Sequence, residues 1–304
     1  MWVFAYSILD EIGKTPLIRL RKINRKRKVK IFAKLEMFNP SGSIKDRIAK
    51  YITEKAERRG FLKNRIIVEP TTGNTGISLA FVSAIKGYKF IAVMPEFVSS
   101  ERRKIIEAYG GKVVLVPKEK GVEGVVKKAK FLAKKLKAYL PNQFENPWNV
   151  EAHMKTTGRE IVESLKRIDY FVAGVGTGGT LIGVARALKK KFEKVSIIAV
   201  EPFESAVLSG GKPGFHRIEG IGEGFVPKIV EENFELIDGI IRVRERDAFK
   251  TSKILMKKEG IFAGVSSGAN VYASLLIAKK IKEGTIVTVL PDSADRYFST
   301  KLFK

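Results

Sequence analysis

The stretch Asn39-Pro40-Ser41-Gly42-Ser43-Ile44-Lys45-Asp46-Arg47 places one lysine where a short polar turn opens a predicted helix. The preceding residues 30–35 (KIFAKL) are typical of a strand, and apolar side chains recur at helical spacing after the turn. Ser43 is expected to cap this helix, with Asp46 in its first turn. Lys45 would then lie at the positive end of the helix dipole, where partial burial would lower its pKa further. A lysine of this kind can act as a free amine and form a Schiff base.

The composition indicates a globular protein with a hydrophobic core. The chain has 304 residues, of which 44% are hydrophobic, enough for one large domain or two of ordinary size. It has no apolar run long enough to span a membrane, and residues 1–6 lack the basic region and cleavage site of a signal peptide. Without cysteine there is no disulfide, thiol nucleophile or thiolate metal site. We therefore expect a cytoplasmic protein, with no metal and no membrane partner.

The charge balance is strongly basic, with 57 Lys and Arg against 32 Asp and Glu and a net charge of +25. A nucleic-acid partner is not expected, because the basic residues are scattered along predicted helices and no nucleic-acid-binding signature occurs. A positive field would instead attract anionic substrates and cofactors. Abundant charges and a single glutamine, Gln143, are a composition typical of thermophiles.

Short apolar strands alternate with helical patterns along the whole chain, which predicts an α/β fold with mostly parallel sheets. The predicted strands are residues 30–35, 65–69, 90–94, 113–116, 170–173, 196–200, 240–243 and 285–290. The predicted helices are residues 44–59, 76–86, 101–109, 121–137, 152–165, 179–191, 245–259 and 269–282. The Pro- and Asn-rich residues 141–147 mark the best domain boundary. In such folds ligands bind at the carboxyl ends of the strands.

Two loops at these carboxyl ends offer groups to anions. Pro70-Thr71-Thr72-Gly73-Asn74-Thr75-Gly76 follows one strand and has free backbone N–H groups that suit an amino-acid carboxylate, although plain helix capping is the commoner role. Gly174-Val175-Gly176-Thr177-Gly178-Gly179-Thr180 follows another strand and suits a phosphate. Leu181 breaks the GxGxxG pattern, and no Walker lysine is present, so a nucleotide is disfavoured.

Two further turns, Phe262–Ala269 and Pro291–Tyr297, bring hydroxyl and charged side chains to the same end of the predicted strands. Either can be a local cap or part of a site. A lysine able to form a Schiff base, together with a phosphate loop that lacks nucleotide features, suggests pyridoxal 5'-phosphate (PLP) as cofactor.

The chain resembles the cysteine synthase family, also called O-acetylserine or O-phosphoserine sulfhydrylases, among the fold-type II PLP enzymes, and lies close to cystathionine β-synthase. The motifs NPSGSIKDR, EPTTGNTG, GTGGT, EGIGEGFVP, GVSSGA and PDSADRYFST occur in family order from about Ile8 to Thr300, nearly the whole chain. The resemblance implies two α/β domains, each an open, mostly parallel twisted sheet flanked by helices, with PLP in the cleft between them. Residues 1–11 and 35–145 would form the smaller, mobile substrate-binding domain. Residues 12–34 and 146–304 would form the larger PLP-phosphate-binding domain.

The resemblance also implies roles for individual residues. Lys45 would carry the cofactor and exchange the proton at the substrate α-carbon. The other cofactor-binding residues would be Asn74 at the 3'-oxygen, Gly176, Thr177, Gly178, Gly179 and Thr180 at the phosphate, and Ser266 at the pyridine nitrogen. The substrate would be bound by Thr71, Thr72, Asn74, Thr75, Gln143 and Gly220. Thr72 departs from the usual serine and narrows the pocket, and Arg159 replaces a proline.

The implied reaction replaces the β-substituent of an activated serine by sulfide. Lys45 removes the α-proton, the substituent leaves, hydrosulfide adds at the β-carbon, and Lys45 returns the proton. Acetate and phosphate both remain open as leaving groups, and use of both donors is slightly favoured. Arg217 is the candidate contact for the phosphate of O-phosphoserine, although Glu219 and Glu223 would repel a phosphate if they pointed inward. Free serine is expected to react poorly, because these motifs show no general acid for its hydroxyl.

Three other functions remain open. The nearest is cystathionine β-synthase, with homocysteine as the nucleophile. Threonine dehydratase is disfavoured because Asp46 follows the lysine. A basic nucleic-acid-binding or regulatory protein on a retired enzyme fold is disfavoured by the intact Lys45 and the intact loop at 176–180. The resemblance further implies a homodimer and, for an O-acetylserine enzyme, a complex with serine acetyltransferase.

Overall fold

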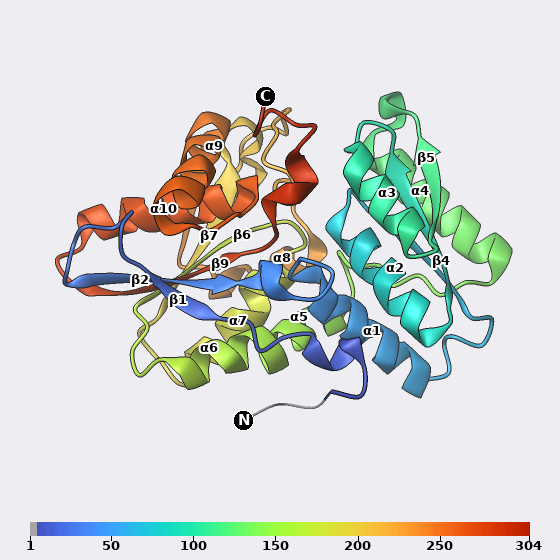
Figure 1. Ribbon diagram of the computed structural model, residues 1–304, viewed down its shortest axis with the longest axis horizontal. Helices are drawn as coiled ribbons and strands as arrows, with labels where there is room; N and C mark the ends of the chain where they lie inside the picture. The colour runs from blue at the N-terminus through green and yellow to red at the C-terminus, as the bar shows by residue number, and fades with distance from the viewer. Residues whose placement is uncertain (1–4) are drawn as a thin grey trace.

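The computed structural model describes residues 5–304, so the first four residues of the predicted segment 1–11 lie outside it. The chain builds two separate sheets, which lie side by side in Figure 1. The larger sheet has the order β1 (Leu17–Leu20), β2 (Val29–Leu35), β9 (Gly284–Leu290), β6 (Tyr170–Gly174), β7 (Ser196–Pro202) and β8 (Gly239–Val243). The smaller sheet has the order β3 (Ile66–Pro70), β4 (Lys89–Pro95) and β5 (Lys112–Val116).

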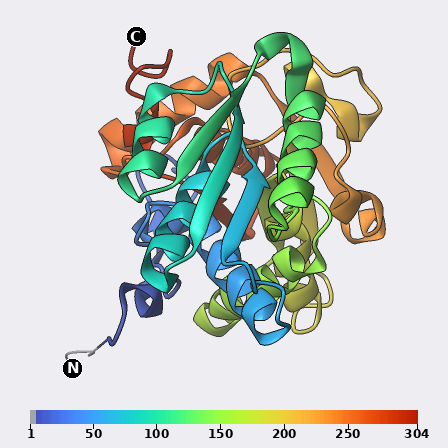
Figure 2. The same ribbon diagram turned by 90° about the vertical axis from the view of Figure 1, so that its right-hand side faces the viewer.

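Helices cover both faces of each sheet. In Figure 1, α9 (Glu245–Ile254) and α10 (Val265–Lys280) lie on one face of the larger sheet, and α5 (Pro147–His153), α6 (Arg159–Ser164) and α7 (Gly179–Lys189) lie on the other. On the smaller sheet, α2 (Asn74–Lys86) and α3 (Ser100–Ala108) pack on one face and α4 (Gly121–Leu136) on the other (Figure 2). The remaining helices are α1 (Lys45–Arg58) and the short α8 (Lys228–Glu231).

The pattern of short apolar strands and amphipathic helices explains this arrangement. Strand β9 is buried along its whole length and pairs in parallel with both β2 and β6, as expected for a strand covered on two faces. All strand pairs are parallel except β1 with β2. The α/β fold with mostly parallel sheets is therefore confirmed, and the eight predicted strands are all present.

Three local features differ from the sequence predictions. Strand β1, an antiparallel edge strand of four residues, was not predicted, because Arg19 interrupts its short apolar run. The predicted helix 152–165 is a longer unit that starts at Pro147 and contains a π-helical turn, Met154–Gly158. The cap of α1 is also shifted, since Ile44 occupies the cap position, while the Ser43 hydroxyl accepts the Lys45 N–H at 3.3 Å.

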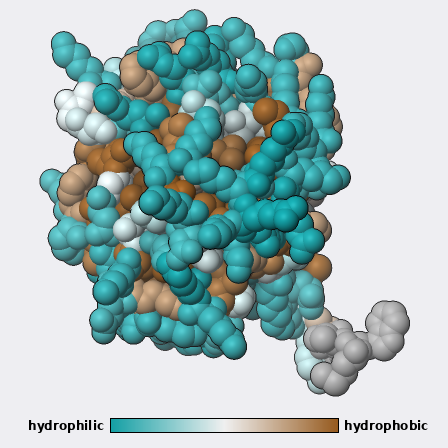
Figure 3. All heavy atoms as spheres, turned by 90° about the vertical axis from the view of Figure 1, so that its left-hand side faces the viewer, coloured by the Kyte–Doolittle hydropathy of each residue, from teal (hydrophilic) through white to brown (hydrophobic). Residues whose placement is uncertain are grey.

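The charged side chains are spread over the surface, as Figure 3 shows for one face, where hydrophilic residues cover most of the area and apolar atoms appear between them. Among residues 5–304, no helix combines the length and the apolar character needed to cross a membrane. The same residues contain no cluster of His, Asp or Glu side chains suited to a metal ion.

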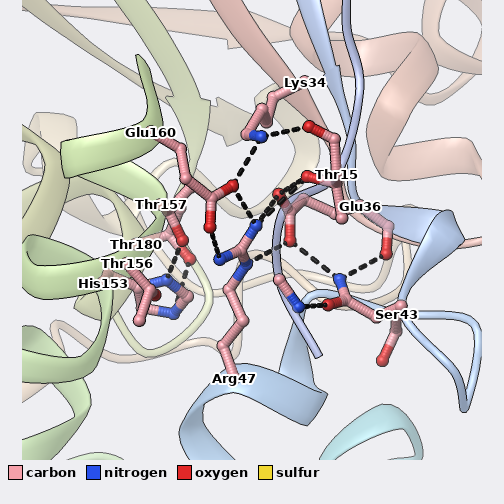
Figure 4. A network of polar contacts seen from close by, with 12 residues as sticks. Thr15, Lys34, Glu36, Ser43, Arg47, His153, Thr156, Thr157, Glu160 and Thr180 are labelled. Atoms are coloured by element: carbon pink, nitrogen blue, oxygen red, sulfur yellow. Dashed lines mark hydrogen bonds and ion pairs between the residues drawn. The ribbon is translucent and has the colours of Figure 1, made fainter. Parts of the chain in front are cut away.

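A buried ionic network fixes the start of α1. Arg47 donates from Nε to Glu36 at 2.7 Å and from Nη1 to Glu160 at 2.7 Å, and its Nη2 reaches both carboxylates and the Thr15 hydroxyl. Lys34 adds a second cation, 2.6 Å from Glu160. Figure 4 shows the guanidinium between the two carboxylates, which come from the turn directly after β2 and from α6.

The network balances its charges in a site where Lys34, Glu36 and Arg47 are buried and Glu160 is partly exposed. Burial favours a neutral carboxyl at Glu36, but the Arg47 guanidinium holds the pKa of Glu36 below its usual range. Burial acts the same way on Glu160, but hydrogen bonds from Arg47 bring the pKa of Glu160 down to about 2. Both acids are therefore ionised at neutral pH, and two cations face two anions. Because Arg47 lies two residues after Lys45, this network fixes the position of the lysine.

We expect Arg47→Ala to lower the free energy of unfolding by about 3–5 kcal/mol, because it leaves the buried Glu36 without its guanidinium partner and Glu160 with Lys34 alone. Denaturation in guanidinium chloride measures this loss. Arg159→Ala is the matched control, since Arg159 pairs with Glu163 at 3.2 Å with 71% and 63% of the two side chains exposed. The control should lose less than about 1 kcal/mol. Equal losses in the two variants would contradict a structural role for the network.

Candidate active site

A cavity lies where the carboxyl ends of β3, β6 and β9 face one another, between the two sheets. Its walls contain most of the residues predicted from the sequence, namely Lys45, Thr71, Thr72, Asn74, Thr75, Gln143, Gly176, Thr177, Gly178, Thr180, Gly220 and Ser266. Loops far apart in the sequence therefore meet at one site.

Two predicted residues do not line this cavity. Gly179 lies behind the loop surface, where a Cβ would come within 1.9 Å of the Asn149 side chain. Arg217 is held by Glu245, which accepts from its backbone N–H at 2.7 Å and from its guanidinium at 3.1 Å. The guanidinium also lies over the Phe215 ring. The structure thus gives Arg217 a partner outside the cavity.

Lys45 is the only lysine among the cavity residues of the described chain. Burial lowers the pKa of Lys45 to about 8, although the negative charges of Glu223 and Asp292 oppose this shift. Near neutral pH a substantial fraction of the side chain is therefore the free amine that a Schiff base requires. The lowered pKa predicted from the position of Lys45 agrees with this result, with burial as its main cause.

The loop after β6 is shaped to hold an anion. The Thr177 hydroxyl accepts from Asn149 Nδ2 at 2.9 Å, and the Thr180 hydroxyl lies 3.2 Å from His153 Nε2. Burial, together with the nearby charges of Lys45 and Arg47, keeps the pKa of His153 well below its usual range. The ring is thus neutral and orients Thr180 without adding charge. Behind this loop starts α7, whose first backbone N–H groups have no partners within the helix.

The loop after β3 presents hydroxyl groups to the cavity on the side of the smaller sheet. The Thr71 oxygen accepts from the backbone N–H groups of Gly73 at 3.0 Å and Gly76 at 3.1 Å, so its own O–H is free to donate. Thr75 donates to Gln143 at 2.6 Å. The backbone of Gln143 is in turn held by Glu69 at 3.0 Å, and burial raises the pKa of that carboxyl to about 8.

The Asn74 side chain is locked by two charged residues from the segment after β9. Asn74 Nδ2 donates to Asp292 at 2.7 Å, and Arg296 donates to Asn74 Oδ1. Tyr297 donates to the same Asp292 oxygen at 2.7 Å. These contacts fix which atom of the amide is the donor and leave its second N–H available. The segment Pro291–Tyr297, left open by the sequence, thus forms part of the site.

Sequence reasoning missed the direction of three charged side chains. Arg102 on α3 is 2% exposed, lies against Gly73 and pairs with Glu219 across the cavity. Glu219 and Glu223 both line the cavity, so they point inward. No motif marked Arg102, and spacing alone does not reveal where a loop glutamate points.

Comparison with known proteins places this geometry in a family. Residues 8–292 match the family described as pyridoxal-phosphate dependent enzyme. The chain belongs to this family. Its PLP dependence and enzymatic nature, both predicted from the sequence, are therefore confirmed.

The relatives share nearly the whole chain. A cysteine synthase from Staphylococcus aureus is 49% identical over 301 residues, which cover 98% of this chain and 96% of the relative. The crystal structure of an O-ureido-L-serine synthase superposes with a TM-score of 0.96 at 42% identity and covers 99% of this chain and 96% of that one. An O-acetylserine dependent cystathionine β-synthase from Helicobacter pylori has a TM-score of 0.94 at 39% identity and covers both chains completely. The predicted resemblance is thus confirmed.

The residues of the cavity fit PLP. A buried amine matches the aldehyde, and the Ser266 hydroxyl at the start of α10 can face a ring nitrogen. Only glycine fits at positions 176 and 178 of the loop after β6, because a Cβ on Gly176 would lie 2.4 Å from the Gly220 carbonyl oxygen and one on Gly178 would lie 2.3 Å from Val230. The backbone there can approach a phosphate closely.

The amine of Lys45 in the PLP-free protein should react with acylating reagents at a half-maximal rate near pH 8. The neutral amine is the nucleophile, so reactivity rises as the pH rises through the pKa. Ordinary lysines, with a pKa of about 10.4, should follow only at higher pH. Mass spectrometry of each lysine peptide after a short pulse of reagent measures the profile. A Lys45 profile that matches the surface lysines would disprove the lowered pKa.

Gly178→Ala should weaken PLP binding by about tenfold or more, because the added Cβ displaces the loop from Val230. Gly110→Ala is the matched control, since Gly110 has a φ of +79°, close to the +83° of Gly178, but no atom within 4 Å of an added Cβ. Both variants should lose about 1 kcal/mol of stability through the left-handed backbone. Fluorescence titration of the PLP-free proteins separates the two effects. Unchanged PLP affinity in Gly178→Ala would place the phosphate elsewhere.

Proposed function

We propose that the protein is a cysteine synthase that makes L-cysteine from an O-activated L-serine and sulfide. The observation that carries this proposal is the 49% identity to a cysteine synthase over nearly the whole chain, joined to a cavity with a buried lysine amine. PLP, when bound, supplies the electron sink that lets the α-proton and then the β-substituent of the amino acid leave.

The residues of the chain then have separable tasks. Lys45 is the group that binds the cofactor aldehyde, takes the α-proton and later returns it. Thr71 and Thr72 donate hydroxyl groups to the substrate carboxylate, and Asn74 uses its remaining N–H at the cofactor 3'-oxygen. The Ser266 hydroxyl faces the ring nitrogen without keeping it protonated, which suits loss of a good leaving group. The glycines and threonines at 176–180 hold the phosphate.

The charges of the cavity favour O-acetylserine over O-phosphoserine as the donor. Glu219 and Glu223 line the cavity, and a phosphate dianion would meet both carboxyls. Arg102 does not offset them, because it pairs with Glu219. Arg217 remains a proposed phosphate contact only if it leaves Glu245. O-acetylserine is a zwitterion without net charge and avoids this repulsion.

Cystathionine β-synthase activity is the second candidate, supported by the likeness to the Helicobacter pylori enzyme. It differs only in the nucleophile, homocysteine in place of sulfide. Assay of both nucleophiles with the same donor separates the two activities. A higher kcat/KM with homocysteine than with sulfide would replace the first proposal by the second.

We also propose that the smaller substrate-binding domain, residues 1–11 and 35–145, closes over the substrate. We further propose that the protein forms a homodimer and that this homodimer can bind a serine acetyltransferase. Arg47 fastens the first turn of α1 to β2 and α6, so the movement should involve β3–β5 with α2–α4. Closure would exclude water from the reacting carbons. Crystal structures with and without a bound amino acid test closure, and light scattering tests the oligomer.

Lys45→Ala should abolish cysteine formation, because no other amine lines the described cavity. Borohydride should attach the cofactor of the wild-type protein to Lys45, as peptide mass spectrometry can show. Lys50→Ala, which removes the neighbouring lysine on α1 that hydrogen-bonds the Leu9 carbonyl, should retain activity. Attachment of the cofactor to a different lysine would refute this assignment.

The wild-type protein should use O-acetylserine with a higher kcat/KM than O-phosphoserine when sulfide is the nucleophile. Any O-phosphoserine activity should fall more steeply as salt rises, because a dianion depends more on the positive field of the protein. Arg217→Ala should change kcat/KM with neither donor, because the Arg217 guanidinium is paired with Glu245 outside the cavity. A loss of kcat/KM confined to O-phosphoserine in that variant would show that Arg217 contacts the phosphate of the donor.

A further inference from the structure

Glu223 is a carboxyl group in the reaction cavity to which the family comparison assigns no role. It lies in the glycine-rich loop Glu219–Gly224 and lines the same cavity as Lys45. Backbone contacts hold this loop against the phosphate loop, since the Gly222 N–H donates to the Val175 carbonyl at 2.9 Å and His216 contacts the Gly222 carbonyl at 2.8 Å. The position of Glu223 is therefore set by the fold.

Unlike Glu219, the other acid that lines the cavity, and Asp292 nearby, Glu223 makes no hydrogen bond or ion pair with another side chain of residues 5–304. Glu219 pairs with Arg102, and Asp292 accepts from Asn74 and Tyr297. Glu223 is thus the one cavity carboxyl left free to exchange a proton with a ligand.

We propose that Glu223 is a catalytic acid and base at the β-carbon substituent, and that the enzyme consequently accepts unactivated L-serine as a donor. This inference rests on the proposed cysteine synthase function and extends its substrate class from good leaving groups to the hydroxyl group. The Glu223 carboxyl supplies the general acid that the sequence motifs do not show.

The proton and bond changes balance within the site. Lys45 takes the α-proton, the bond from the β-carbon to the serine oxygen breaks, and the Glu223 carboxyl gives its proton to that oxygen, which leaves as water. The Glu223 carboxylate then takes one proton from hydrogen sulfide as sulfur bonds to the β-carbon. Lys45 returns its proton to the α-carbon. The sum is L-serine plus hydrogen sulfide giving L-cysteine plus water, with no change of oxidation state overall.

The electrostatics of the cavity suit this sequence. Burial raises the pKa of Glu223, which favours its protonated form more than in an exposed glutamate, while the charge of Lys45 opposes the rise. Burial lowers the pKa of Lys45 to about 8 at the same time, so the amine can lose and regain a proton near neutral pH. When Lys45 becomes a cation by taking the α-proton, its charge makes Glu223 a stronger acid. The proton thus becomes available when the hydroxyl must leave.

Glu223→Gln, which keeps the shape but cannot exchange a proton, tests the proposal. We expect kcat/KM with L-serine and sulfide to fall by about 10²–10⁴-fold, the usual contribution of general acid–base catalysis. The fall with O-acetylserine should be at least tenfold smaller, because acetate leaves without a proton and hydrosulfide ion in solution needs no base. Glu223→Asp should recover part of the L-serine activity. Glu283→Gln, at an exposed glutamate outside the cavity, should change neither reaction.

A measurement independent of turnover follows the Glu223 proton itself. In the PLP-free protein labelled with carboxyl-¹³C glutamate, the resonance lost in Glu223→Gln should titrate above the usual glutamate pKa of about 4.3. The charged groups that share its cavity are Lys45, Arg102, Glu219 and, through Lys45, Asp292. A resonance that titrates at or below the usual value would overturn the role of Glu223 as an acid.

The outcomes separate this inference from the proposed function. A wild-type protein that converts O-acetylserine but not L-serine would overturn the inference about Glu223. It would not contradict the proposed cysteine synthase function. Equal losses of both activities in Glu223→Gln would also overturn it, because they would indicate a structural role. A wild-type protein inactive on O-acetylserine with sulfide would instead refute the proposed function.

Discussion

The buried contact of Arg47 with Glu36 and Glu160 is the constraint on which the site depends. Isolated charges are costly to bury, and this group is tolerated because two cations face two anions with well-aligned hydrogen bonds. A hydrophobic cluster of equal volume could stabilise the chain as well, but it would not fix how the elements around it are oriented relative to one another. The planar guanidinium demands one arrangement of β2, α1 and α6. It thereby holds Lys45, two residues earlier, at the cavity wall.

The rest of the site follows from how parallel sheets end. Strands β3 and β6 each run into a polar turn and then a helix, so two sets of backbone N–H and hydroxyl groups face one space beside the end of β9. Each turn is held by contacts from elsewhere in the chain, such as Asn149 on Thr177 and Asp292 on Asn74. These contacts prepare the donors before any ligand arrives, which lowers the cost of binding.

Much of this arrangement could be predicted from the sequence. Periodicity revealed eight strands, because buried parallel strands are continuous apolar runs, and it missed β1, because an edge strand of four residues gives too short a signal. Loop motifs identified nearly all cavity residues, although their roles came from the family resemblance rather than from spacing. Side-chain direction in loops could not be predicted. Arg217 turned out to pair with Glu245, whereas Glu223 faces the cavity.

The same limit explains why the net charge of +25 does not by itself determine the donor. At physiological ionic strength, exposed charges more than about 8 Å away are largely screened. A ligand inside the cavity responds instead to the few charged groups that line it, which include Glu219 and Glu223 as well as Lys45. The basic surface can speed the arrival of anions, but in the proposed function the acids that line the cavity disfavour a bound dianion. Selectivity between donors therefore depends on which charged groups lie beside the ligand. The net charge of the chain does not contain that information.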